Sequence, residues 1–240
     1  MKVELMGKTT LTEDYKKYLE HGSLGVALSA IRTCYSPNQP SEILDKEGDK
    51  YFRQNEDGEL DASRLLKTIA ASGHTSTLEH ISFTFAVEDI TRYLLGQLTR
   101  HRAGTSFSVQ SGRYVNAKSD GRMGGAKFHI PEHLPEHVKQ IMKDEFVRQQ
   151  ATYDLLVNEL NTKPEDARGI LGQANTTSLV FSANLRSLLH FYDKRKPGNG
   201  AQAEASELAV KLKEVVVESE PWTAGLFAMI EKNVDEFHNK

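Results

Sequence analysis

The chain has 240 residues, of which 38% are hydrophobic and 26% are charged, and its formal net charge is -3. This length suits one large domain or two small ones, and a chain that is not basic overall lacks the global signature of a nucleic-acid-binding protein. The only cysteine, Cys34, excludes an intrachain disulfide and a four-cysteine zinc site.

The sequence also lacks the usual membrane and export signals. No apolar run approaches the roughly 18 residues that cross a membrane. Residues 1–5 lack the apolar segment of a signal peptide. We therefore expect a cytoplasmic protein without a membrane partner.

The first third of the chain predicts one strand and two helices. Residues 2–6 alternate polar and apolar, as in a strand, and an apolar stripe predicts a helix over 24–34. Residues 36–60 are rich in Pro, Asn, Asp, Glu and Gly, which indicates an exposed loop or insertion. Asp61 is expected to cap a second helix, which Gly73 ends.

The middle of the chain alternates between strands and helices. Residues 81–87 show the clearest strand pattern, and Ile90, Leu94 and Leu98 predict a helix after it. Gln97 and Arg100 lie three residues apart near the end of that helix. Beyond it we expect a loop from 103, a short strand at 111–115 and a mobile, glycine-containing segment at 116–126.

The last part of the chain is predicted to be helical. A polar helix at 135–160 is expected to bury Ile141, Phe146, Tyr153, Leu155 and Leu156, and Pro164 opens a shorter helix that holds Arg168. The remaining expectations are a helix at 182–194, a turn at 196–200 and helices at 201–219 and 222–232. The pattern as a whole predicts an α+β fold, a single helix-rich domain over 1–240 around a small mixed or antiparallel sheet.

One stretch carries most of the chemical information. Arg100-His101-Arg102 is followed, after eight residues, by Ser111-Gly112-Arg113-Tyr114. Arginine presents a planar fork of donors that matches phosphate oxygens, serine adds a neutral donor, and Gly112 allows close backbone approach to an anion. The stretch therefore indicates a phosphate site, and a solvated basic surface is the alternative.

The surrounding charge pattern points the same way. Only Asp120 opposes the basic residues in this patch. A basic patch on a mildly acidic chain favours a focused anion site. Its members are Arg92, Arg100, Arg102, Arg113, Lys118, Arg122 and Lys127.

These residues, with four further segments, resemble the flavin-dependent thymidylate synthase family. The family pattern has seven residues between Arg-His-Arg and the serine, and an acidic residue where Val109 stands. The other matching segments, in family order, are Gly73-His74 to Glu79-His80 with Ile81–Phe85, then Asn184-Leu185-Arg186-Ser187-Leu188, Ala201–Glu204 and Pro221-Trp222-Thr223.

The resemblance implies a fold and a reaction. The reaction is reductive methylation of dUMP to dTMP, with methylenetetrahydrofolate as carbon donor and NADPH-reduced FAD as hydride source. It implies a homotetramer with active sites shared between subunits, and it requires no cysteine nucleophile. Neither a Rossmann glycine motif nor a P-loop is present, so a flavin here would need arginines for its phosphates.

The resemblance also implies residue roles. Catalysis is expected to involve Arg195, His74 and Ser111, with Arg195 facing the uracil and His74 by the flavin ring. The substrate dUMP would be held by Gln97, Arg100, Ser111, Gly112, Arg113, Arg168 and Arg195. The FAD cofactor would be held by Ser76, Glu79, Arg100, His101, Arg102, Asn184, Arg186 and His190. Asn199 and Gly200 stand where the family has a histidine.

Other features leave alternatives open. His129, His133 and His137 recur every four residues, but Pro131 and Pro135 interrupt that helix, so we expect no metal site. Cys34 fits a small buried side chain. Two other functions stay open: a non-catalytic nucleotide- or RNA-binding module using residues 92–127, and a flavoprotein with a changed substrate.

Overall fold

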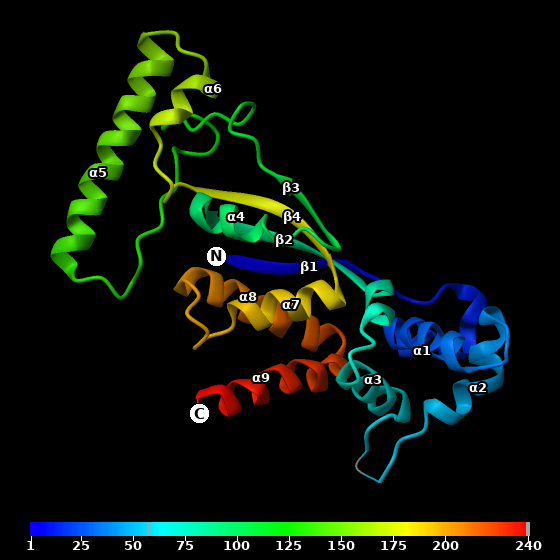
Figure 1. The fold of residues 1–240 in the computed structure, drawn as a ribbon. Coiled ribbons are helices and arrows are strands. Elements are labelled where there is room, and N and C mark those ends of the chain that lie inside the picture. Colours follow the sequence, from blue (N-terminus) through cyan, green and yellow to red (C-terminus); the bar gives the residue numbers. More distant parts are fainter. Residues whose placement is uncertain (57, 239–240) are drawn as a thin grey trace. The chain divides into compact units, whose positions relative to one another are not determined.

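The computed structural model describes residues 1–56 and 58–238, so Asp57 within the predicted loop and the last two residues lie outside it. The α+β fold is confirmed: a four-stranded sheet has the order β1-β2-β4-β3 (Figure 1). The amide of Thr9 donates to Ser82, Gln110 to Ser178, and Asn184 to Gly104. These pairings run in opposite chain directions, so the sheet is antiparallel.

The residues cluster into two compact units. Unit 1 contains residues 1–2, 86–100 and 107–180, and unit 2 contains residues 3–85, 101–106 and 181–240. The four strands, β1 (Lys2–Lys8), β2 (Ser82–Thr91), β3 (Thr105–Val109) and β4 (Thr176–Asn184), each contribute residues to both units. A single domain over 1–240 therefore stays a prediction.

The two central strands are built from residues that alternate between core and polar neighbours. Within unit 2, the ring of Phe85 lies 6.0 Å from that of Phe181, and the hydroxyls of Thr84 and Ser182 are hydrogen-bonded at 2.8 Å. Strand β2 is longer than predicted and includes Ile90, which is fully buried. Strand β4 was not predicted: its residues 182–184 were assigned to a helix that starts only at Leu185.

Each central strand leads directly into a capped helix. Thr91 ends β2, and its hydroxyl accepts the Leu94 amide at 3.1 Å to start α4 (Arg92–Leu98). Asn184 ends β4, and its side chain accepts the Ser187 amide at 2.9 Å to start α7 (Leu185–Arg195). A side-chain oxygen at the first position satisfies an otherwise unpaired helix amide, which fixes where each helix begins.

The segment after α4 differs from the prediction. Strand β3 covers Thr105–Val109 in the expected loop, where aromatic and β-branched residues alternate with serine. The expected strand at 111–115 is wrong, because the Tyr114 and Val115 amides both donate to the Ser111 carbonyl in a turn. Residues 116–126 form turns and irregular structure.

The predicted loop at 36–60 is also wrong in part, because it contains α2 (Ile43–Tyr51). Ile43 and Leu44 are buried, and a Cβ on Gly48 would lie 2.7 Å from the ring of Tyr18. Helix α2 packs against α1 (Gly22–Tyr35), which is the helix predicted at 24–34. The segment was predicted as a loop because its polar residues outnumber the few apolar residues that form the buried face of α2.

The remaining helices follow the predicted order, with differences at their ends. Asp61 is the first residue of α3 rather than its cap, and it pairs with Arg64 at 3.1 Å, whereas Gly73 follows the helix end with φ +84°. Of the apolar residues predicted to pack from the helix at 135–160, Tyr153 is buried, but Ile141 and Leu155 are 67% and 42% exposed. Every described helix is too short or too polar to cross a membrane. The bounds are α3 Asp61–Ala71, α5 Glu136–Asp154, α6 Pro164–Ala167, α8 Ala203–Ser219 and α9 Ala224–His238.

The carboxylate of Glu47 on α2 holds the end of α1. It pairs with Arg32 at 2.6 Å, accepts from Asn38 at 2.8 Å and accepts from the Ser36 hydroxyl. Burial would raise the pKa of Glu47, but the hydrogen bonds from Ser36, Asn38 and Arg32 outweigh it and lower the pKa. The ionised form is therefore the one that stabilises this corner.

We expect Glu47→Gln to lower the free energy of unfolding by about 1–2 kcal/mol near neutral pH, because the charge on a strong hydrogen-bond acceptor is lost. Because the pKa of Glu47 is lower in the folded state, its ionisation stabilises the folded protein at pH values above 4.5, the pKa in the unfolded state. This stabilisation is lost as the pH falls through the folded-state pKa. Urea unfolding should therefore show a difference near neutral pH that shrinks as the pH is lowered below 4.5.

Glu42→Gln is the matched control, because Glu42 pairs with Lys46 at the surface. An effect of Glu42→Gln as large as that of Glu47→Gln, or a Glu47→Gln effect that persists in acid, would contradict the assignment.

Candidate functional site

A cavity of about 510 Å³ lies within unit 1. It brings together three residues of the predicted substrate set: Ser111, Gly112 and Arg168. It also includes Arg92, which the motif analysis did not assign to the site. The remaining lining residues are Gly96, Gln110, Val115, Ala117, Met123, Ala126, Tyr153, Gly169, Leu171, Gly172, Gln173, Asn175, Thr176 and Thr177.

The loop that carries Ser111 and Gly112 is fixed by hydrogen bonds. The Gln110 amide donates to Ser178 at 2.9 Å, and the Ser111 hydroxyl accepts the Arg113 amide at 3.3 Å. A Cβ on Gly112 would lie 3.1 Å from the Arg168 side chain. The glycine therefore lets the backbone approach the Arg168 side chain closely.

Two arginines give the cavity its electrostatic character. Burial lowers the pKa of the Arg92 guanidinium, and the positive charge of Arg168 lowers it further. In the part of the chain that the structure describes, Arg92 has no carboxylate partner, and the Arg168 Nε donates to the Glu165 carbonyl at 3.1 Å. An anion in the cavity would relieve the repulsion between these two cations.

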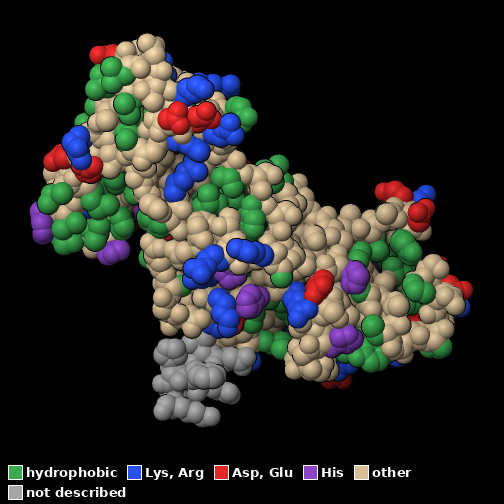
Figure 2. All heavy atoms as spheres, turned by 45° about the horizontal axis from the view of Figure 1, so that its top comes forward, with side chains coloured by type: hydrophobic (Ala, Val, Ile, Leu, Met, Phe, Trp, Pro, Cys, Tyr) green, Lys and Arg blue, Asp and Glu red, His purple; other side chains and the backbone are tan. Residues whose placement is uncertain are grey.

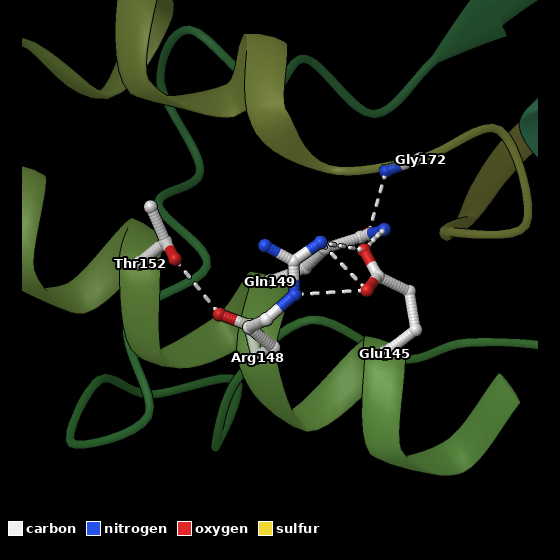
Figure 3. A network of polar contacts seen from close by, with 5 residues as sticks. All are labelled: Glu145, Arg148, Gln149, Thr152 and Gly172. Carbon is white, nitrogen blue, oxygen red and sulfur yellow. Dashed lines mark hydrogen bonds and ion pairs between the residues drawn. The ribbon is translucent and has the colours of Figure 1, made fainter. Parts of the chain in front are cut away.

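Helix α5 holds the loops around the cavity with neutral side chains. Gln149 accepts the Gly172 amide at 2.9 Å and donates to Glu145, which Arg148 also binds (Figure 3). Gln150 accepts the Ala126 amide at 2.7 Å and donates to the Ala117 carbonyl at 2.8 Å. These bonds fix both sides of the irregular segment 116–126.

Four predicted substrate residues do not line this cavity: Gln97, Arg100, Arg113 and, in unit 2, Arg195. Gln97 is on α4, and Arg100 follows that helix as an exposed side chain. Arg113 is 56% exposed and pairs with Glu165 at 2.8 Å. An incoming phosphate would have to compete with that carboxylate for Arg113.

A second cluster of predicted residues lies in unit 2. The ring of His101 lies 5.9 Å from that of His190 and 4.9 Å, edge-on, from that of Phe191. Burial lowers the pKa of His101, and the charges of Arg195 and His190 lower it further. His101 is therefore neutral near pH 7 and can donate or accept a hydrogen bond.

Cationic groups without partners accompany this cluster. The Nε of Arg195 is buried without a hydrogen-bond partner among the described residues. Arg102 is exposed and has no ion pair in the described ranges. Arg186, by contrast, pairs with Glu79. On the face drawn in Figure 2, Lys and Arg side chains gather around His side chains, with few acidic ones among them.

The structure also places the other residues predicted to lie near the flavin. Asn184 caps α7, and a Cβ on Gly104 would lie 2.2 Å from its side-chain nitrogen, so residue 104 must be glycine-like in size. Ser76 is exposed at the start of a 3-10 turn. His74 precedes that turn, and its Nδ1 lies 3.0 Å from the Tyr35 hydroxyl.

Two further predictions can be compared with the structure. Cys34 is exposed rather than buried, with its sulfur 3.7 Å from the Ala30 carbonyl. Of the three spaced histidines only His137 is on α5, which begins after Pro135. Among the described residues no group of three His, Cys, Asp or Glu side chains could hold a metal ion.

The fold and these clusters define an α+β protein with sites suited to anionic ligands. Residues 17–222 match the family model described as thymidylate synthase complementing protein. Over 193 residues the chain is 34% identical to the flavin-dependent thymidylate synthase of Geobacter sulfurreducens, covering 80% of this chain and 75% of that one. Over 175 residues it is 32% identical to the same enzyme of Nitratidesulfovibrio vulgaris, with coverages of 72% and 69%. The chain belongs to the flavin-dependent thymidylate synthase family.

The fold of this chain is similar to that of a solved structure. A crystal structure of the flavin-dependent thymidylate synthase of Helicobacter pylori with FAD and dUMP is similar to this chain with a TM-score of 0.66 and 24% identity. The match covers 95% of this chain and 99% of that one. This likeness concerns the fold, and the flavin-dependent thymidylate synthase fold is confirmed.

We expect Arg195→Met to raise the pKa of His101 toward 6.5, because it removes a like charge that disfavours the imidazolium. Titration of His101 by NMR would measure this shift. Arg186→Met is the control, since Arg186 is paired with Glu79 and should leave the His101 midpoint in place. Equal midpoints in the wild type and Arg195→Met would show that the two groups do not interact.

Proposed function

We propose that this enzyme converts dUMP to dTMP by reductive methylation, with methylenetetrahydrofolate as carbon donor and NADPH as the source of reducing equivalents. The observation that carries the proposal is the cavity where Arg92, Ser111, Gly112 and Arg168 converge. Two cations, a hydroxyl and a glycine backbone suit a phosphate dianion. The solved Helicobacter pylori relative, which contains dUMP, supports this choice of ligand.

Arg195 is assigned to the uracil. A fixed cation near N3 and O2 of the ring would stabilise the negative charge that develops there and would make C5 more nucleophilic. The buried Nε of Arg195 has no partner in the described part of the chain, which supports a ligand as its partner. Activation of this kind requires no covalent bond to the enzyme.

The residues of unit 2 fit a flavin. Arg102, which has no ion pair among the described residues, offers a guanidinium for a pyrophosphate, and the rings of His101, His190 and Phe191 lie together in the same unit. Asn184, Ser76, Arg186 and Glu79 complete the proposed set in unit 2. The family pattern also assigns Arg100 to the flavin. When bound, reduced FAD would supply the hydride.

The proposal includes a homotetramer whose active sites are shared between subunits. Apolar side chains on and after α5 are exposed in the single chain: Ile141 by 67%, Val147 by 70% and Leu160 by 62%. Side chains of this kind support burial against another protein surface. We propose no nucleic-acid partner, and a cytoplasmic location.

The first test follows the visible absorption of the purified protein with FAD and NADPH, with and without dUMP, together with dTMP formation. Flavin bands that bleach faster with dUMP, and dTMP that requires methylenetetrahydrofolate, are expected. Flavin without dUMP-dependent turnover would favour a changed substrate. Salt-sensitive RNA binding without flavin would favour the binding module.

In the same assay, Arg195→Met should retain FAD but lose about 10²–10³ in turnover, the range seen when a preorganised electrostatic group is removed. Cys34→Ser is the contrasting variant and should stay close to wild type. Near-normal dTMP formation by Arg195→Met, or inactive Cys34→Ser with bound flavin, would overturn the assigned chemistry.

Arg113→Met should chiefly weaken dUMP binding, by roughly 1.5–3 kcal/mol if its phosphate contact is fully made. The matched control is Lys127→Met, which removes the same charge from the basic patch but from an exposed pair with Asp89. Calorimetric titration with dUMP measures both affinities. Equal weakening in the two variants would indicate a general field effect instead of a contact at Arg113.

A further inference from the structure

Tyr35 and His74 form a polar contact that the residue roles above leave unexplained. The Tyr35 hydroxyl lies 3.0 Å from His74 Nδ1, and the two rings meet edge-on at 79° with centroids 6.0 Å apart. Tyr35 is the last residue of α1, and His74 follows α3 after Gly73. Two helix ends therefore meet through this pair.

The backbone of His74 is fixed independently of its side chain. Its amide donates to the Ile69 carbonyl at 3.2 Å, and the next amide, of Thr75, donates to Gly73 at 2.9 Å. Gly73 has φ +84°, a conformation that favours glycine and turns the chain sharply after α3. With the main chain held in this way, the ring is the part of His74 that still has freedom to rotate.

The residues on either side of Tyr35 are bound by Glu47 of α2. Ser36 donates from its amide to Arg32 at 2.7 Å and from its hydroxyl to Glu47. Glu47 also binds Arg32 and Asn38, so one carboxylate joins three groups around the end of α1. The segment 36–60 therefore supports the position of Tyr35.

Core packing does not account for this tyrosine. Tyr35 is 56% exposed, so its ring adds little buried area, and its hydroxyl is directed to a ring nitrogen. A phenol is a better donor than a neutral imidazole N–H, so the arrangement with Tyr35 donating to Nδ1 is favoured. Nε2 then carries the ring proton.

We infer that Tyr35 is a positioning residue for His74, which holds its ring in one orientation and in the tautomer with the proton on Nε2. The inference rests on the proposed function only in placing His74 by the flavin ring. There, a fixed Nε2–H would present a hydrogen-bond donor without a search among rotamers.

The test is NMR of protein labelled with ¹⁵N at histidine, recorded where the imidazoles are neutral. The His74 signals among those of 9 histidines are identified by their loss in His74→Gln. In the wild type we expect His74 nitrogen shifts of a single Nε2–H tautomer. In Tyr35→Phe the two shifts should move toward each other, as in an exchanging mixture.

Tyr15→Phe is the matched control, because it removes a tyrosine hydroxyl that has no hydrogen bond within the described residues. It should leave the His74 shifts unchanged. Identical His74 shifts in the wild type and Tyr35→Phe, or an Nδ1–H tautomer in the wild type, would overturn the inference. Amide spectra of each variant show whether it is folded, and Glu47→Gln offers a second route to loosen Tyr35 without changing the pair.

Turnover separates this inference from the proposed function. With flavin and dUMP, Tyr35→Phe should lower turnover by about five-fold and leave the KM for dUMP unchanged, the pattern of a misplaced group. A wild-type protein without flavin or dTMP formation would refute the proposed function, and the tautomer result would still decide the role of Tyr35.

Discussion

The antiparallel pairing of β2 with β4 is the constraint on which both candidate sites depend. Thr84 meets Ser182, and the Asp89 amide donates to the Ser178 hydroxyl at 3.3 Å, so the register is set at both ends of the pair. Each strand then runs without a loop into a helix capped by its own last residue. Helix α4 leads to the Arg-His-Arg motif, and α7 carries Arg186, His190 and Arg195. A one-residue slip of the pair would exchange the buried and exposed faces of the slipped strand and displace the helix that follows it.

Partners divide the arginines of the candidate sites into two kinds. Arg113 and Arg186 are paired with the carboxylates of Glu165 and Glu79. A phosphate that binds either arginine must replace its carboxylate, so the net gain in binding free energy is only the difference between the two ion pairs. Arg92 has no carboxylate partner in the described residues, and its charge is opposed by burial and by Arg168. Since the chain carries a net charge of -3, long-range attraction of an anion is weak and the local arrangement must supply the affinity.

Particular residues show what could be predicted from the sequence and what could not. The strand at 81–87 was predicted because large apolar residues alternate there. Strand β4 was not, because its buried positions include Thr177 and Ala183, which carry little apolar signal. Ser111 and Gly112 were predicted from their motif. Arg92 was not assigned to the site, because it lies 19 residues before Ser111 in the chain. The fold brings it to the Ser111 loop by placing it where β2 passes into α4.

The two candidate sites differ in what holds them together. The cavity in unit 1 is bounded by loops that Gln149, Gln150 and the Tyr153 hydroxyl bind, and none of these groups changes charge in mild acid. In unit 2 the support of His74 passes through Tyr35 to the carboxylate of Glu47, which is effective only when ionised. Acid should therefore loosen the surroundings of His74 through Glu47. In the cavity it acts on Asp154, which accepts the Ser119 amide at 3.0 Å, and it leaves the hydrogen bonds of Gln149, Gln150 and Tyr153 in place.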